Sequence, residues 1–190
     1  MKPTFAFLLL PAILLVATLS AADTTVAVDD FRFTKAVDIQ DQRLTLKGAG
    51  LLRYMVFIKA YAGALYLPDS APSDPVLSPV AKRLELAYYH AIRSEDFAKA
   101  TRAKILDNVD ADQAQKLRTR IDRLATMYRD VKPGDRYALT YLPGEGTRLS
   151  LNGDVLGSIP GDDFAGAVFS IWLGDHPIDE TFRDTLLGVS

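Results

Sequence analysis

The segment from Leu44 to Pro68 constrains the fold of this chain more than any other. From Phe57 onward its residues alternate, and successive side chains of a β-strand point to opposite faces of the sheet. The even-numbered side is mostly alanine, so its small side chains leave room for a helix to pack very close to it. The odd-numbered side combines a lysine and a tyrosine with glycine and leucine. The two sides comprise Ile58, Ala60, Ala62, Ala64 and Tyr66, and Lys59, Tyr61, Gly63, Leu65 and Leu67.

The odd-numbered side has the composition of a small-molecule pocket. Such pockets combine an apolar wall with a few convergent polar groups. The alternative is an ordinary sheet strand whose Lys59 points into water, and the residues alone leave both interpretations open. Gly48 and Gly50 precede this strand and predict a turn or bulge, where the backbone can adopt positive φ.

Composition excludes several functional classes. The length of 190 residues favours one domain. The net charge of −2 gives no support for nucleic-acid binding, which favours a basic surface. Cysteine is absent, so the chain has no disulfide framework and no thiolate metal site. His90 and His176 are far apart and stand in no ligand-spaced cluster, so we expect neither a metal nor a cofactor.

The first 22 residues have the features of a secretory signal peptide. Lys2 precedes an apolar run from Phe5 to Leu19, and Ser20-Ala21-Ala22 follows as a cleavage site. An uncleaved membrane anchor is the alternative, but the run is shorter than the roughly 20 residues that span a bilayer, and Pro11 interrupts it. We therefore predict a signal peptide at 1–22, a mature domain at 23–190, a periplasmic location and no stable membrane insertion after cleavage.

The rest of the chain predicts strands at both ends and helices between and after them. Helix starts follow Ser94, Asp110 or Asp112, and Asp162-Asp163. The apolar stripe of the second helix is Leu117, Ile121, Leu124, Tyr128 and Val131. The expected strands are 26–33, 36–47, 84–91, 137–142, 147–152 and 155–159, and the expected helices are 94–106, one from about 110, one ending at Gly174, and a short one carrying Phe182, Leu186 and Leu187. This order indicates an α+β fold with helices on one face of an antiparallel sheet.

Several motifs together resemble the bacterial chalcone-isomerase-like proteins. These motifs are Gly48 and Gly50 with Arg53, Lys59-x-Tyr61-x-Gly63-Ala64-Leu65-Tyr66-Leu67, Gly134-Asp135, Pro143-Gly144-x-Gly146-Thr147, Asn152-Gly153, and Ile171-Trp172-Leu173-Gly174-Asp175. The resemblance covers nearly all of the chain after its leader. It implies an open-faced β-sandwich of chalcone isomerase type, with a ligand cleft between the sheet and the helices.

The resemblance also implies site residues. Plant enzymes of this family cyclise a chalcone with the help of an arginine, a threonine, a tyrosine and an asparagine. Carried over by position, the arginine falls near Arg53, with a register ambiguous by at least one residue, and the threonine position holds Tyr61. The other tyrosine has no match, and Asn108 is a weak candidate for the asparagine. Relatives that bind fatty acids without catalysis grip the carboxylate with an arginine and a tyrosine, and Lys59-x-Tyr61 resembles that pattern better.

Two functional hypotheses follow. The leading one is an exported, non-catalytic protein that binds a fatty acid or a similar amphipathic anion. Its ligand-binding residues would be Arg53, Lys59, Tyr61, Leu65 and Tyr66. The alternative is a chalcone-isomerase-type intramolecular lyase in which Arg53 and Tyr61 are catalytic. A third interpretation is a structural protein whose own side chains fill the cleft. The identity of the ligand and the oligomeric state stay open.

Overall fold

The computed structural model describes residues 24–55, 57–69 and 76–189. The predicted signal peptide at 1–22 lies outside the described residues. Within the described ranges, no helix combines the length and the apolar character that a membrane span requires.

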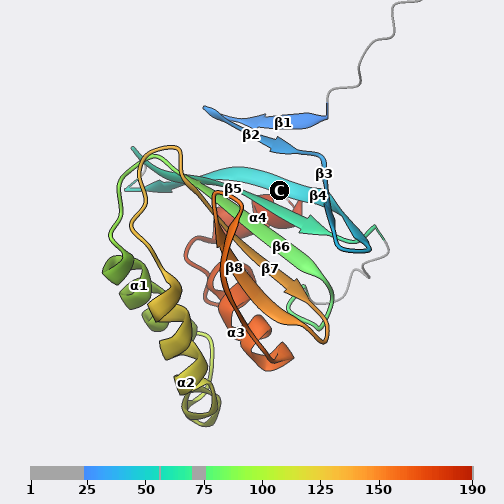
Figure 1. Ribbon diagram of the computed structural model, residues 1–190. Helices are drawn as coiled ribbons and strands as arrows, with labels where there is room; N and C mark the ends of the chain where they lie inside the picture. Colours follow the sequence, from blue (N-terminus) through green and yellow to red (C-terminus); the bar gives the residue numbers. More distant parts are fainter. Residues whose placement is uncertain (1–23, 56, 70–75, 190) are drawn as a thin grey trace, which may run out of the picture.

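The described residues form a seven-stranded antiparallel sheet whose strands follow one another in chain order, from β3 to β9. Figure 1 shows this sheet curving around the helices. Short turns connect β3 to β4, β4 to β5, β7 to β8 and β8 to β9, whereas two helices lie between β6 and β7. The strands are β3 (Ala36–Ile39), β4 (Gln42–Tyr54), β5 (Ile58–Leu67), β6 (Lys82–Tyr88), β7 (Arg136–Leu142), β8 (Gly146–Leu151) and β9 (Asp154–Ile159).

Four helices in the described part of the chain lie on one face of this sheet (Figure 1). They are α1 (Ser94–Leu106), α2 (Ala111–Met127), α3 (Asp162–Leu173) and α4 (Glu180–Leu187). The stripe predicted for α2 is buried along its whole length and joins the main hydrophobic core. The predicted α+β class, with one helical layer on an antiparallel sheet, is therefore confirmed.

A two-stranded hairpin covers part of the opposite face. It consists of β1 (Thr25–Val28) and β2 (Phe31–Thr34), and Figure 1 shows it above the sheet, away from the helices. The single strand predicted for 26–33 is wrong, because Asp29 adopts a φ of +53° and reverses the chain. The strand predicted for 36–47 is likewise divided, by a turn in which Gln40 has a φ of +52°.

The alanine-rich side of β5 packs under this hairpin, not under a helix. Ala62, Ala64 and Tyr66 share a second buried cluster with Phe33 and Leu44. The helix that the sequence allows on this side is therefore replaced by the hairpin. Small side chains do permit close approach, but here the hairpin makes that approach.

Helix α4 instead packs closely on the other face, over three glycines. A Cβ atom on Gly48 would lie 2.2 Å from the Thr185 carbonyl oxygen, and one on Gly50 would lie 2.6 Å from Thr185 Cγ2. A Cβ atom on Gly63 would lie 2.6 Å from Phe182 Cζ. The strand shifts register between Leu46 and Gly48, as the predicted bulge requires, but neither Gly48 nor Gly50 has positive φ. Their role is to leave room for a helix.

Helix starts differ slightly from expectation. Asp110 caps α2 as predicted, with its side chain accepting from the Gln113 backbone N–H. The cap of α1 is Arg93 rather than Ser94, whose backbone N–H donates instead to Asp130. The cap of α3 is Gly161, so Asp162 lies in the first turn, where an acidic side chain favours the helix dipole.

Candidate functional site

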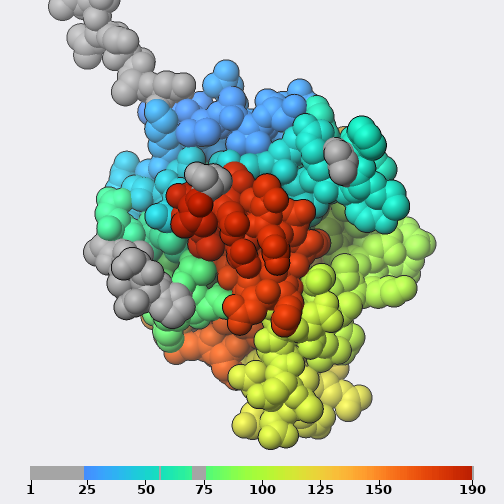
Figure 2. Space-filling model, turned by 180° about the vertical axis from the view of Figure 1, so that it is seen from behind, coloured from blue at the N-terminus to red at the C-terminus, as the bar shows by residue number. Residues whose placement is uncertain are grey.

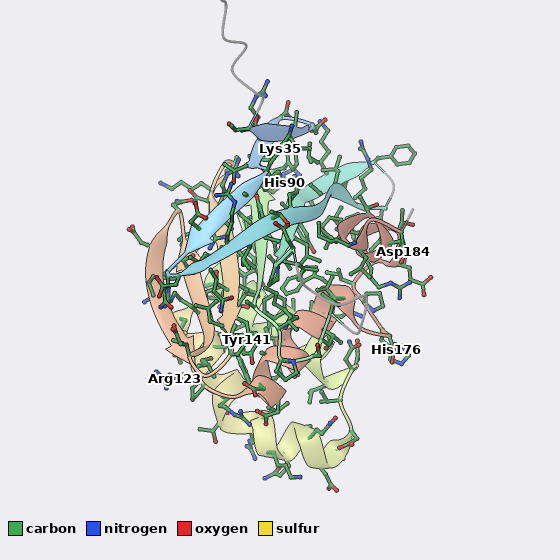
Figure 3. All side chains as sticks on the ribbon, turned by 90° about the vertical axis from the view of Figure 1, so that its right-hand side faces the viewer. Lys35, His90, Arg123, Tyr141, His176 and Asp184 are labelled. Atoms are coloured by element: carbon green, nitrogen blue, oxygen red, sulfur yellow. The ribbon has the colours of Figure 1, made fainter. Side chains whose placement is uncertain are left out.

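Aromatic side chains from the sheet and from all four helical segments meet between the two layers. We call this set the aromatic interior. Figure 3 shows side chains filling the space between sheet and helices. The set comprises Tyr61 of β5, Tyr88 of β6, Phe97 of α1, Tyr128 at the end of α2, Tyr137 of β7, Trp172 of α3 and Phe182 of α4.

The rings pack mainly edge to face. The Tyr61 ring centroid lies 5.7 Å from that of Tyr88 and 5.6 Å from that of Phe182. The Tyr88 centroid lies 5.2 Å from that of Phe97. Edge-to-face pairs orient rings specifically and add stabilisation beyond the buried area. The interior is therefore a shaped apolar environment in which a few hydroxyl groups are the polar features.

The hydroxyl groups differ in how far their hydrogen bonds are satisfied. The Trp172 Nε1–H donates to the Tyr61 hydroxyl oxygen at 2.9 Å. Among the described residues, the Tyr61 hydroxyl proton has no acceptor, and the Tyr88 hydroxyl has no hydrogen-bond partner. By contrast, the Tyr137 hydroxyl accepts from the Arg129 N–H at 2.6 Å and donates to the Arg129 carbonyl at 2.8 Å. Tyr61 and Tyr88 thus each keep a hydroxyl proton that no described residue accepts, on side chains that are themselves buried.

Both available hydroxyls are held neutral. Burial raises the pKa of Tyr61 above its ordinary value, the Trp172 hydrogen bond opposes this shift, and the nearby Asp179 carboxylate adds to it. Burial also raises the pKa of Tyr88 well above its ordinary value, with a further contribution from Tyr61. Neither residue is therefore a phenolate near neutral pH. Each can donate a hydrogen bond but is poorly suited to act as a base.

The surface is hollowed where three elements that contribute to this interior, α1, α4 and the β4–β5 hairpin, come together (Figure 2). Figure 2 shows the hollow between α4 in red, the teal end of the β4–β5 hairpin and the yellow-green α1. Tyr61 and Trp172 keep exposed fractions of 7% and 8%, so the interior is nearly closed. The Tyr61 hydroxyl thus lies among closely packed apolar rings, near the surface of the molecule.

A family model described as chalcone isomerase-like matches residues 25–188, which is most of the chain. The chain belongs to the chalcone isomerase-like family. The crystal structure of a fatty-acid-binding protein from Arabidopsis thaliana is similar to this family member, with a TM-score of 0.66 and 15% sequence identity. The similarity covers 86% of this chain and 95% of that one. No curated protein sequence matches the chain.

In this chalcone isomerase-like chain, the structure divides the sequence-predicted site residues between two faces. Tyr61 and Leu65 lie in the core on the helix side. Tyr66 lies on the hairpin side, where it is fully buried and its hydroxyl is hydrogen-bonded to Thr34. Lys59 also contacts the hairpin, with its Nζ 2.6 Å from Asp29 Oδ2 and 3.7 Å from Asp30 Oδ2. Tyr66 and Lys59 therefore do not meet Tyr61.

A β-bulge explains why the side chains of Lys59 and Tyr61 point to opposite faces of the sheet. Leu52 pairs with Tyr61, whereas the next residue, Arg53, pairs with Lys59, so Ala60 is an extra residue in β5. Such a bulge reverses the alternation of side chains on one side of it. Ala60 packs against the same core as Tyr61, and Lys59 turns to the other face. Arg53, which lies near the end of β4 in the β4–β5 hairpin, is exposed.

The family asparagine candidate serves a different purpose. Asn108 follows α1, and its side chain accepts from the His176 backbone N–H at 3.0 Å and donates to the His176 carbonyl at 2.9 Å. It therefore joins the α1–α2 connection to the segment before α4. Figure 3 shows His176 and His90 in different parts of the molecule, and no group of potential ligands for a metal occurs among the described residues.

Sequence reasoning missed most members of the aromatic interior. Tyr88 was detectable, because it shares the parity of Leu84 and Leu86 on the predicted partner strand. Trp172 and Phe182 lie on the apolar faces of predicted helices, but periodicity does not show which strand a helix face meets. Their convergence on Tyr61 requires the three-dimensional fold.

Proposed function

We propose that this protein is a non-catalytic binding protein for a fatty acid or a similar amphipathic anion, held in the aromatic interior. The observation that carries the proposal is the Tyr61 hydroxyl. Its oxygen accepts from Trp172, and its proton has no acceptor among the described residues. A buried donor in an apolar environment favours a ligand that brings an acceptor, because an unpaired polar group costs free energy.

In the proposed complex, the ligand head group accepts hydrogen bonds from Tyr61 and Tyr88. The tail lies against Leu65, Phe97 and Phe182, which belong to or pack against the main core. The hydroxyls supply donors without a cation, and the Asp179 carboxylate near Tyr61 opposes full negative charge on the head group. A carboxylic acid fits this arrangement better than a phosphate, because its acidic form can also be bound.

The same features favour binding over chalcone cyclisation. Cyclisation requires a phenolate nucleophile, and a cation would stabilise its charge. Arg53, the arginine suggested by the family resemblance, is exposed and pairs across the strands with Lys59 instead of meeting Tyr61. The raised pKa values of Tyr61 and Tyr88 also leave no phenolate base near neutral pH.

The proposed site of action is the periplasm, after removal of residues 1–22. The Lys2-led apolar run and Ser20-Ala21-Ala22 support export. Intact mass and N-terminal sequencing of the fractionated protein test this, with a chain beginning at Asp23 expected. Recovery of the uncleaved chain in the membrane fraction would overturn it.

Titration of palmitate into delipidated protein tests the binding function. Trp172 is the single tryptophan of the chain, so its fluorescence reports directly on the interior. We expect saturable binding with a change in Trp172 emission, and a fatty acid in mass spectra of lipid extracted from the periplasmic protein. Absence of saturable binding, or binding without any change in Trp172 emission, would refute the proposed site.

A further inference from the structure

The end of the β4–β5 hairpin carries four exposed, large apolar side chains. We call this set the β4–β5 tip: Tyr54, Met55, Phe57 and Ile58, with exposed fractions of 59%, 69%, 88% and 46%. Figure 2 shows the hairpin end as a teal lobe at the surface of the molecule. A phenylalanine that is almost completely exposed is unfavourable in water, so the tip calls for an explanation.

The other exposed large apolar side chains among the described residues are not clustered along the chain as these four are. Leu106, Val155, Ile178 and Val189 belong to different parts of the chain. Single exposed apolar residues are ordinary on protein surfaces, whereas a contiguous patch marks an interaction site. The four side chains of the β4–β5 tip form a patch of this kind.

The two basic residues at the base of the tip differ in whether an acidic residue neutralises their charge. The Lys59 ammonium is neutralised by Asp29 and Asp30 of the β1–β2 turn. Arg53 is exposed and has no ion-pair partner among the described residues. One free guanidinium thus stands beside the apolar side chains, where a long arginine side chain can reach an anionic group above them.

We propose that the β4–β5 tip docks the protein on the surface of a lipid bilayer. The apolar side chains would enter the boundary between head groups and acyl chains, and Arg53 would contact lipid phosphate. Tyrosine at the rim fits this boundary, because its ring is apolar and its hydroxyl remains hydrated. Docking of this kind leaves the chain outside the hydrocarbon core. It does not depend on whether the interior binds a ligand.

Geometry favours a bilayer over a protein partner or a second copy of this chain. Four side chains at the end of one hairpin offer much less than the roughly 800 Å² per partner that a stable protein interface buries. The tip is also convex, whereas interfaces between proteins match two shaped surfaces over a broad area. A fluid bilayer accommodates a projecting hairpin without a complementary pocket.

The β4–β5 tip lies next to the surface hollow. Figure 2 shows the teal lobe on the rim of this hollow. A bilayer contacted by the tip would therefore lie near this hollow. The geometry suits transfer of an amphipathic molecule between the membrane and the interior.

Vesicle co-sedimentation of the mature chain tests the proposal. The probes are phosphatidylethanolamine vesicles containing phosphatidylglycerol, and vesicles of phosphatidylcholine alone. Phe57→Ser should weaken partitioning to both kinds of vesicle by about tenfold, which corresponds to about 1.4 kcal/mol and lies within the transfer free energy of one phenylalanine side chain. Arg53→Gln should weaken binding several-fold to the anionic vesicles and leave binding to the phosphatidylcholine vesicles unchanged. Val155→Ser is the matched control, because Val155 is 59% exposed but stands apart from the tip, and it should change nothing.

The outcomes separate this proposal from the proposed function. Phe57→Ser should keep the wild-type melting temperature and the wild-type affinity for palmitate in solution, since its side chain contacts solvent. Equal partitioning of wild type and Phe57→Ser, or failure of the wild type to bind either vesicle, would overturn the docking proposal. Sedimentation velocity that shows a dimer abolished by Phe57→Ser would also overturn it, because the patch would then join two copies of the chain.

Discussion

The indole Nε1–H of Trp172 donates to the hydroxyl oxygen of Tyr61 across 2.9 Å. This single contact joins α3 to β5 inside the core and fixes the direction in which the phenol ring points. It also leaves the Tyr61 proton free of described acceptors. The chain's one tryptophan thus reports on the group that the proposed ligand would contact.

Tyr61→Phe and Tyr66→Phe should have different effects, although the two tyrosines are close in sequence. Tyr61→Phe removes a neutral hydrogen bond to the proposed ligand, worth about 1 kcal/mol, and should weaken palmitate binding roughly fivefold. Tyr66→Phe acts on the hairpin face and should leave affinity unchanged, while its lost contact with Thr34 lowers the free energy of unfolding by about 1 kcal/mol. Calorimetric titration measures the affinity of each variant for palmitate, and urea denaturation measures its free energy of unfolding. Equal losses of affinity in the two variants would contradict the division between faces.

Chalcone cyclisation should proceed no faster with the protein than without it. The family resemblance places Tyr61 where the plant enzymes use threonine, the pKa of Tyr61 is raised by burial, and Arg53 is exposed. The decay of chalcone absorbance with and without purified protein measures the rate. An acceleration that disappears in Tyr61→Phe would instead favour the intramolecular lyase.

Gly48→Ala and Gly166→Ala should change stability in opposite directions. A methyl group at position 48 would stand 2.2 Å from the Thr185 carbonyl oxygen, so α4 must move and the free energy of unfolding should fall by about 3 kcal/mol. At position 166 in α3, the added Cβ would meet nothing closer than the Leu77 carbonyl oxygen at 3.6 Å. Alanine there should stabilise the helix by about 0.5–1 kcal/mol. Urea denaturation of the two variants and the wild type gives the sign of each change in the free energy of unfolding. An unchanged free energy of unfolding in Gly48→Ala would argue against close packing of α4.

Lys82 should make stability rise with pH in the alkaline range. The side chain is fully buried, and its Nζ donates to the carbonyls of Ser78 and Val80, both at 2.8 Å. Burial lowers the pKa of Lys82 to about 8, a shift that the Asp162 carboxylate partly opposes. Because the folded chain binds this proton less tightly than the unfolded chain does, the destabilisation is complete below pH 8 and diminishes as pH rises towards the unfolded pKa.

Urea denaturation between pH 7.5 and 9.5 measures this effect. Tyrosines of the unfolded chain begin to ionise over the same interval, and because the folded tyrosines have raised pKa values this lowers the stability of the wild type and of Lys82→Met alike. Relative to Lys82→Met, which lacks the titrating group, the unfolding free energy of the wild type should rise by about 1–2 kcal/mol over that interval. A difference between the two proteins that stays constant over the same interval would show that Lys82 keeps its ordinary pKa.

Local patterns predicted most of the fold, because they depend on neighbouring residues. The stripe from Leu117 to Val131 is buried, and the turn at Asn152-Gly153 has positive φ at both residues, as a tight hairpin requires. Strict alternation failed at Ala60, where one extra residue reverses the parity of β5. No local signal in the sequence marks that residue as the bulge, since it is set by the pairing with β4.

The candidate site was predictable only in part for the same reason. Tyr61 and Leu65 lie in the interior, as the odd-numbered face of β5 suggested. Lys59 and Tyr66 do not, because the first lies beyond the bulge and the second belongs to the alanine-rich face. The partners Trp172 and Phe182 come from two helices far along the chain from β5, and the packing of α4 on Gly50 and Gly63 decides the position of Phe182.

The glycine-lined contact between β4 and α4 also determines when the interior is completed. Strands β4 and β5 are synthesised more than a hundred residues before the helix that closes over Gly48 and supplies Phe182. Contacts between such distant segments form late in folding, because a long loop must close first. A chain to which α4 has not yet been added therefore has an unfinished interior. The apolar side chains of β4 and β5 that face α4 stay open to water until that helix has packed against the three glycines.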